Sequence, residues 1–273
     1  MLESLVNFKE INEKPYMMAI WAFIICCIAV LISSQVPLSV PGTNSGFIVV
    51  LFVIIPSVYF ITHFLKKEEE IEEGDIARHN YKNFWSRHEK DILILLFYFF
   101  GLTIAFSIWS FFLPQSFFSA QLTKINEIQG MQTFVADPLM GQATGAAAGP
   151  AAFNKILFNN LQVMFFSFIF SFIFGAGAIF IIAWNASVLG VYIGQLSKYV
   201  WHIPIVSLSF LPHGIPEIAG YLAAGLAGGL MSAAIIRKNS SETLRAVSVD
   251  VAKILVIGVI LIVLGAGIES FIS

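Results

Sequence analysis

Charged residues are scarce in this sequence. Lys, Arg, Asp and Glu make up 12% of its 273 residues, whereas a soluble domain carries about 25%. The formal net charge is -2, so the chain has no large basic excess of the kind that binds nucleic acid. Its two cysteines, Cys26 and Cys27, are adjacent inside an apolar run. Neighbouring cysteines rarely pair with each other, so we expect no disulfide framework.

Motifs for catalysis and cofactor binding are also missing. The chain contains no His-Glu-x-x-His helix, no Ser-x-x-Lys or Gly-x-Ser-x-Gly motif and no phosphate-binding loop. We therefore predict a protein that is not an enzyme, with no catalytic residue, no cofactor and no metal site.

Long apolar runs are abundant instead. Hydrophobic residues make up 58% of the chain and the mean hydropathy is +0.83, and about 20 apolar residues suffice to cross a bilayer core. The runs that reach this length are residues 17–36, 47–65, 92–113, 161–184, 215–236 and 254–272. Counting the more polar segment 185–211 as well, we predict an all-α, polytopic membrane helix bundle of about seven transmembrane segments.

Positive charge is unevenly distributed among the connections. If the N-terminus is cytoplasmic and all seven segments cross, the connections 66–90 and 237–253 lie inside and hold most of the Lys and Arg. The external loop 114–160 then holds only Lys124 and Lys155. This asymmetry follows the positive-inside rule. It predicts a multi-pass cell-membrane protein with a cytoplasmic N-terminus and an external C-terminus.

The fifth segment, 185–211, differs from the other six. Lys198 and His202 fall inside it and Pro204 interrupts it. A lysine at the centre of a transmembrane helix costs about 2.5 to 3.5 kcal/mol on insertion scales, so Lys198 should not face lipid. We predict a broken or partly interfacial segment. Lys198 and His202 then lie either at the membrane surface or along a wet cavity inside the bundle.

The stretch Pro212-His213-Gly214-Ile215-Pro216-Glu217 carries the strongest candidate site. It places an imidazole and a carboxyl group four residues apart beside an apolar run, and ionisable groups at membrane depth are candidates for function. Gly214 permits backbone conformations that other residues avoid, and Pro216 suits the first turn of a helix. In that turn the helix dipole would stabilise Glu217 by about 0.3 to 1 kcal/mol. The sequence thus leaves a structural and a functional explanation open.

Small residues recur at i,i+4 spacing in the second half of the chain. The pairs are Gly190 with Gly194 and Gly225 with Gly229. Such pairs let helix backbones approach closely. We expect them to pack helices within the bundle rather than to form a homodimer face, although a homo-oligomer stays open. Asn185 ends the fourth apolar run and is expected to cap the next helix, with ligand contact as the alternative.

These residues together resemble a known family. An apolar span ended by Asn185, the Gly190 and Gly194 pair, the stretch 212–217 and the Gly/Ala-rich span with Gly228 and Gly229 are similar to the stage II sporulation protein M family of integral membrane proteins. The resemblance covers residues 157–236 and, more loosely, the last span. It implies a polytopic membrane protein that works with cell-wall hydrolases during engulfment in spore formers. The family also occurs in bacteria and archaea that do not sporulate.

The chain departs from the sporulation members in its N-terminal part. Those members resemble a bundle of about five spans, so residues 1–90, with two spans and a charged cytoplasmic loop, form an addition to the bundle of residues 91–273. A role in sporulation is therefore not transferred. The resemblance implies that His213, Gly214 and Glu217 belong to the shared site.

Two functions remain as hypotheses. In the first, the protein is a scaffold that recruits or positions envelope protein partners in membrane remodelling, with the lipid bilayer as its surroundings. In the second, it is a transporter or lipid-handling permease in which Lys198, His202, His213 and Glu217 line a polar path. The two differ in whether these four side chains converge on one cavity.

Overall fold

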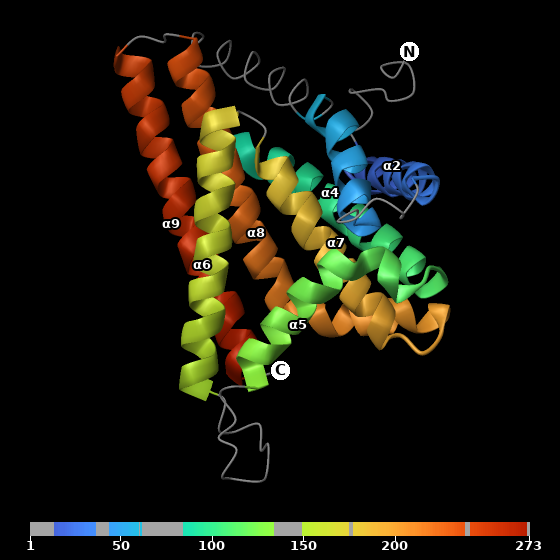
Figure 1. Cartoon of the computed structure of the whole chain (residues 1–273). Coiled ribbons are helices and arrows are strands. Elements are labelled where there is room, and N and C mark those ends of the chain that lie inside the picture. Colours follow the sequence, from blue (N-terminus) through green and yellow to red (C-terminus); the bar gives the residue numbers. More distant parts are fainter. Residues whose placement is uncertain are drawn as a thin grey trace.

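The computed structural model describes residues 14–36, 44–59, 61, 84–133, 149–174, 177–237 and 241–271. These residues form helices and no strand (Figure 1). The elements are α2 (Met17–Ser34), the helix Ser45–Tyr59, α4 (Phe84–Phe112), η2 (Gln115–Phe118), α5 (Ser119–Thr133), α6 (Gly149–Phe174), α7 (Ala178–Leu196), η3 (Val200–His202), α8 (Ile203–Ile236) and α9 (Ser241–Phe271).

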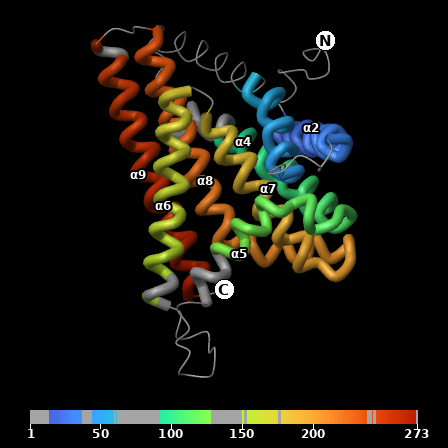
Figure 2. Tube along the Cα trace, viewed as in Figure 1, coloured from blue at the N-terminus to red at the C-terminus, as the bar shows by residue number. Residues whose placement is uncertain are grey.

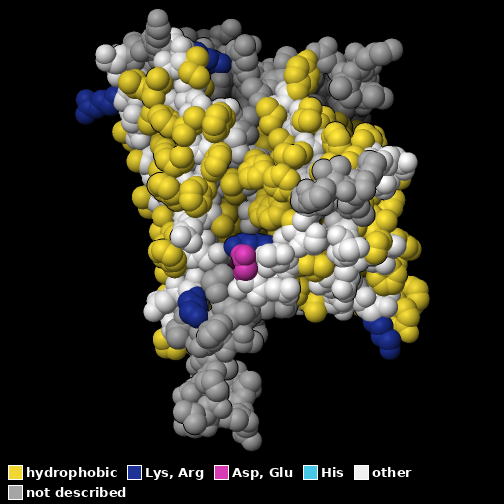
Figure 3. Space-filling model, in the orientation of Figure 1, with side chains coloured by type: hydrophobic (Ala, Val, Ile, Leu, Met, Phe, Trp, Pro, Cys, Tyr) yellow, Lys and Arg dark blue, Asp and Glu magenta, His cyan; other side chains and the backbone are white. Residues whose placement is uncertain are grey.

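Six of these helices are long and apolar enough to cross a membrane. The helix Ser45–Tyr59 is apolar but shorter, and most of the predicted charged loop 66–90 lies outside the described residues. Large hydrophobic side chains also point outward, among them Ile20, Phe112, Phe174 and Ile236. Hydrophobic side chains cover much of the face in Figure 3, where charged side chains are few. The prediction of an all-α membrane bundle is confirmed, because helices that are apolar all round require an apolar surrounding.

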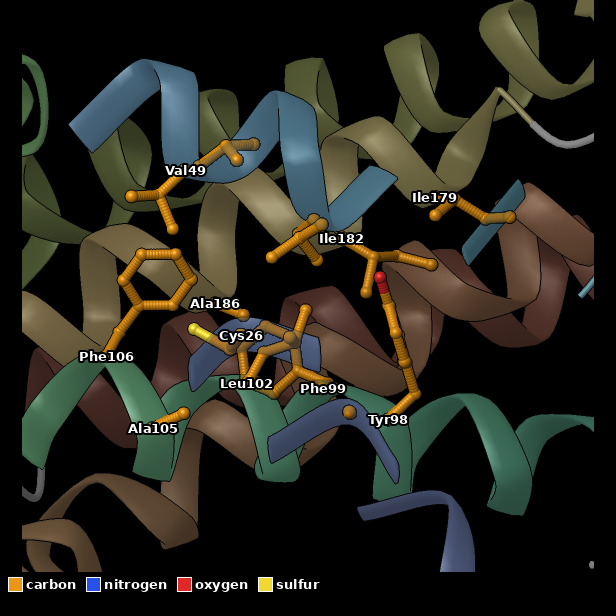
Figure 4. Packing of buried hydrophobic residues seen from close by; sticks show 14 of the residues in the cluster. Cys26, Val49, Tyr98, Phe99, Leu102, Ala105, Phe106, Ile179, Ile182 and Ala186 are labelled. Atoms are coloured by element: carbon orange, nitrogen blue, oxygen red, sulfur yellow. The ribbon is translucent and has the colours of Figure 1, made fainter. Parts of the chain in front are cut away.

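Two groups of helices make up the bundle (Figure 2). In the first, α2, the helix Ser45–Tyr59, α4 and α7 enclose one large apolar cluster, which Ile218 and Leu222 of α8 also join. Figure 4 shows Val49 of the helix Ser45–Tyr59, Leu102 and Phe106 of α4, and Ile182 of α7 converging there. In the second, α6, α8 and α9 pack together around two smaller clusters. α2 packs against α4, and the helix Ser45–Tyr59 contributes to the same apolar cluster.

The predicted boundary between the fourth and fifth segments is wrong. Residues 161–184 read as one apolar run, but α6 ends at Phe174 and α7 begins at Ala178. A hydropathy pattern does not reveal this break, because the residues around Gly177 are glycine and alanine, which add no polar signal. A β-carbon on Gly177 would collide with the Phe170 carbonyl oxygen, so the chain reverses direction where only glycine fits.

Asn185 consequently does not cap a helix. It lies in the middle of α7, where its Nδ2 donates a hydrogen bond of 2.7 Å to the carbonyl oxygen of Ile181. The side-chain amide of Asn185 is therefore hydrogen-bonded to the backbone of its own helix, one turn earlier. The break expected within residues 185–211 occurs after Leu196, where α7 ends and a short connection leads into η3.

Glycines bring the helices of both groups close together. A β-carbon on Gly190 would lie 2.6 Å from the Phe106 β-carbon of α4, and one on Gly194 would lie 2.5 Å from the Ser107 carbonyl oxygen. One on Gly225 would lie 2.5 Å from the β-carbon of Ala178 in α7. Gly229 is half-buried. Close backbone approach of this kind is how membrane helices gain packing energy.

Candidate functional site

The stretch 212–217 lies inside α8 and not at its start. The helix begins at Ile203, so Pro212 and Pro216 are internal prolines. The expectation that Pro216 opens a helix and that the helix dipole explains Glu217 is therefore wrong. Prolines persist inside membrane helices because neighbouring groups satisfy the freed backbone. Each removes an i→i−4 hydrogen bond and bends the helix, and Figure 1 shows α8 changing direction along its length.

Lys198 and His202 lie apart from this stretch. Lys198 is exposed in the connection after α7, with its Nζ 5.6 Å from the centre of the Tyr199 ring. The His202 ring packs against Tyr199 and Trp201 at 5.2 and 6.3 Å between centroids. About 15 residues of mostly helical chain, roughly 20 Å, separate His202 from Glu217. The four side chains proposed for a polar path do not converge.

Glu217 instead packs against α9. A β-carbon on Gly265 would lie 2.5 Å from Cγ of Glu217 and 3.0 Å from the His213 carbonyl oxygen. One turn beyond Gly265 on α9 stands Glu269, and the two carboxyl groups interact electrostatically. Gly265 thus makes room for one carboxylate and brings it near a second. The sequence hypothesis did not include Glu269, although a lone carboxylate in the last apolar run was a usable signal.

Polar groups from α6 and α8 complete the cluster. The Tyr221 hydroxyl donates a hydrogen bond of 2.6 Å to Oδ1 of Asn160, which also accepts one of 3.2 Å from Nδ2 of Asn159. Asn160 is only 4% exposed, and both Asn160 and Tyr221 interact with Glu217. Residues spaced by four share a face of a helix, so His213, Glu217 and Tyr221 lie along one face of α8.

Two atoms of this cluster have no hydrogen-bond partner in the described part of the structure. They are Oε1 of Glu217 and Nδ2 of Asn160, both buried. A buried polar atom left without a partner costs about 1 to 3 kcal/mol, and a charged one costs more. Buried polar atoms without a partner in a membrane helix therefore indicate a functional site.

His213 and Gly214 stand at the edge of this cluster. The His213 ring lies 5.9 Å from that of Phe210, which in turn contacts Tyr192 of α7. A β-carbon on Gly214 would meet only Ile218 Cδ1 at 4.0 Å, so no close neighbour requires glycine there. Among the described residues no group of three His, Cys, Asp or Glu side chains could hold a metal ion.

Comparison with known proteins agrees with the resemblance seen in the sequence. A family model described as stage II sporulation protein M matches residues 93–273. That match begins inside α4 and includes Asn160, Glu217, Tyr221 and Glu269. An uncharacterized protein of Methanocaldococcus jannaschii is 31% identical over 125 residues, covering 44% of this chain and 70% of that protein. No solved structure matches the chain.

Proposed function

Because the chain belongs to the stage II sporulation protein M family, we propose that it is a non-enzymatic membrane protein that recruits or positions partners in remodelling of the cell envelope. The separation of Lys198 and His202 from Glu217 is the observation that favours this function over the four-residue polar path. A path needs its polar groups to line one cavity. A scaffold needs only a stable bundle that presents a surface.

The amphiphilic helix α5 is the surface that best suits a partner. It is not among the apolar spans, and Thr123, Asn126 and Glu127 are exposed on it. Gln121 holds it to the bundle through hydrogen bonds of 3.0 Å to the Gly46 carbonyl oxygen and 3.2 Å to Oγ of Ser187. On the predicted topology, α5 faces the exterior, where envelope enzymes act.

Site-specific crosslinking in native membranes tests this function. A photo-reactive residue replacing Asn126 should yield a discrete crosslinked protein adduct. The matched control places the same residue at Phe174, which is exposed on the apolar face and should yield lipid adducts only. Absence of any protein adduct at several exposed positions of α5 would contradict the scaffold.

A second function, a cation-coupled permease, is favoured by one observation, the buried Oε1 of Glu217 beside Glu269. It uses a different set of residues from the polar path considered above. Flux into proteoliposomes distinguishes the two functions, since Glu217→Gln abolishes transport by a permease. A scaffold gives no flux with either protein.

A further inference from the structure

Among the described residues, the groups that interact with Glu217 are Glu269, Asn160 and Tyr221, and none of these carries a positive charge. Two ion pairs of the described residues, Lys124 with Glu127 and Lys253 with Asp250, do not include either carboxyl group. Two ionised carboxylates in an apolar bundle repel each other and lose their hydration. Some positive charge must therefore accompany them, or one of them must be protonated.

Oxygen atoms surround the place where that charge would sit. Glu217 offers an unpartnered Oε1 and Glu269 faces it from α9. Asn160 of α6 and Tyr221 of α8 lie beside Glu217, where the Asn160 amide can donate to a carboxylate oxygen, and His213 lies one turn before Glu217. Because Pro216 has no N–H, the carbonyl of Pro212 also lacks its usual helical donor. Carboxylate and carbonyl oxygens of half-broken helices are the groups that hold small cations in membrane proteins.

We propose that Glu217 and Glu269 form an exchangeable site for one small monovalent cation, a proton or a sodium ion. A single positive charge removes the repulsion between two carboxylates and leaves a net charge of about -1, which the Asn160 amide and Tyr221 hydroxyl can stabilise. A divalent metal fits less well, since the described residues bring only two carboxyl groups together here and no third His, Cys, Asp or Glu side chain to share such an ion.

Glu269 lies nearer to the end of its helix than Glu217 does. Glu269 lies in the last turn of α9, which ends at Phe271, whereas Glu217 lies in the interior of α8. An ion would thus meet Glu269 first and Glu217 second, from one side of the bundle. This inference holds whether the protein recruits partners or carries a solute, because it concerns occupancy of the site alone.

The proton arm of the test uses infrared difference spectroscopy on the full-length protein in lipid nanodiscs. Lowering the pH at constant potassium should produce a protonated-carboxyl band that Glu217→Gln and Glu269→Gln each remove. The matched control Glu127→Gln removes an exposed carboxylate of α5 and should keep that band. Glutamine preserves size and hydrogen bonding, so monodisperse elution shows that each variant has folded.

The sodium arm measures the thermal midpoint at constant pH and ionic strength while sodium replaces potassium. A rise of several degrees, lost in Glu217→Gln and Glu269→Gln but not in Glu127→Gln, assigns the ion as sodium. The proposal is overturned if wild type and both site variants respond alike in the two arms. It is also overturned if His213→Gln removes the responses as fully as Glu217→Gln does, because His213 would then supply the counter-charge.

Discussion

The two groups of helices differ in one kind of polar group, because the carboxyl pair of Glu217 and Glu269 lies in the second group. In the α2, α4 and α7 group, buried Ser57, Thr103 and Ser107 each donate to a carbonyl oxygen one turn back on their own helix, at 2.6, 2.9 and 2.8 Å. In the α6, α8 and α9 group, Tyr221 of α8 donates across helices to Oδ1 of Asn160 in α6. This second group also contains a pair of carboxyl groups.

The difference shows which polar residues in a membrane bundle call for a functional explanation. A hydroxyl that bonds to its own helix needs neither a partner helix nor a ligand, so it adds little beyond shape. A carboxyl group cannot be satisfied by its own backbone in this way. It requires a proton, an ion or a counter-charge, and its position therefore indicates a site.

Phe106→Ala should lower the stability of the first group and give the largest loss among the variants considered. The side chain is fully buried and packs against Phe118 with ring centroids 6.4 Å apart. The cavity left by the truncated side chain should lower the free energy of unfolding by about 3 kcal/mol. SDS-induced unfolding in mixed micelles measures this loss. Phe165→Ala, at a position 58% exposed, is the control and should change little. Equal losses would show that Phe106 is not part of a tightly packed core.

Gly228→Leu should disturb the second group by a smaller amount. A β-carbon there would lie 2.9 Å from the backbone nitrogen of Phe172 in α6, so α6 and α8 must move apart. We expect a loss of about 2 kcal/mol in the same unfolding measurement. Gly267→Leu is the matched control, because nothing lies within 4 Å of a β-carbon on Gly267. A similar loss in both variants would contradict the close contact.

Tyr221→Phe tests how much one inter-helix hydrogen bond contributes to the stability of the second group. Removing the hydroxyl deletes the 2.6 Å bond to Asn160 and should cost about 1 kcal/mol. The counterpart in the first group is Tyr98→Phe, whose buried hydroxyl lies beside Ser57 but makes no hydrogen bond of good geometry among the described residues. That variant should be as stable as wild type or more so. If Tyr98→Phe proves the more harmful, the comparison between the groups fails.

Ser107→Ala should have the smallest effect. Its hydroxyl bonds only within α4, so the loss should be under about 0.5 kcal/mol. Thermal midpoints from fluorescence-detected size-exclusion chromatography would register it against wild type. A large loss would mean that the hydroxyl also supports the contact with Gly194, whose β-carbon would lie 2.5 Å from the Ser107 carbonyl oxygen.

The sequence located the candidate site more accurately than it explained it. Glu217 and His213 stand out in the sequence because ionisable residues are rare in apolar runs. The sequence does not reveal the partners of Glu217, because Asn160 is far away along the chain and Glu269 lies near the end of the last apolar run. Nearness in sequence groups Lys198 and His202 with Glu217. Helical geometry instead places them roughly 20 Å away.

Composition and run length by themselves determined that this chain is a helical membrane bundle, because only helices or closed barrels satisfy the backbone in lipid. The family also followed from the stretch 212–217 and its flanking glycines. Only the tertiary structure decided that Pro212 and Pro216 lie inside α8 and that Gly265 admits Glu217 beside Glu269. Hydropathy describes whether each segment prefers lipid or water, but it carries no information about which helices pack against each other.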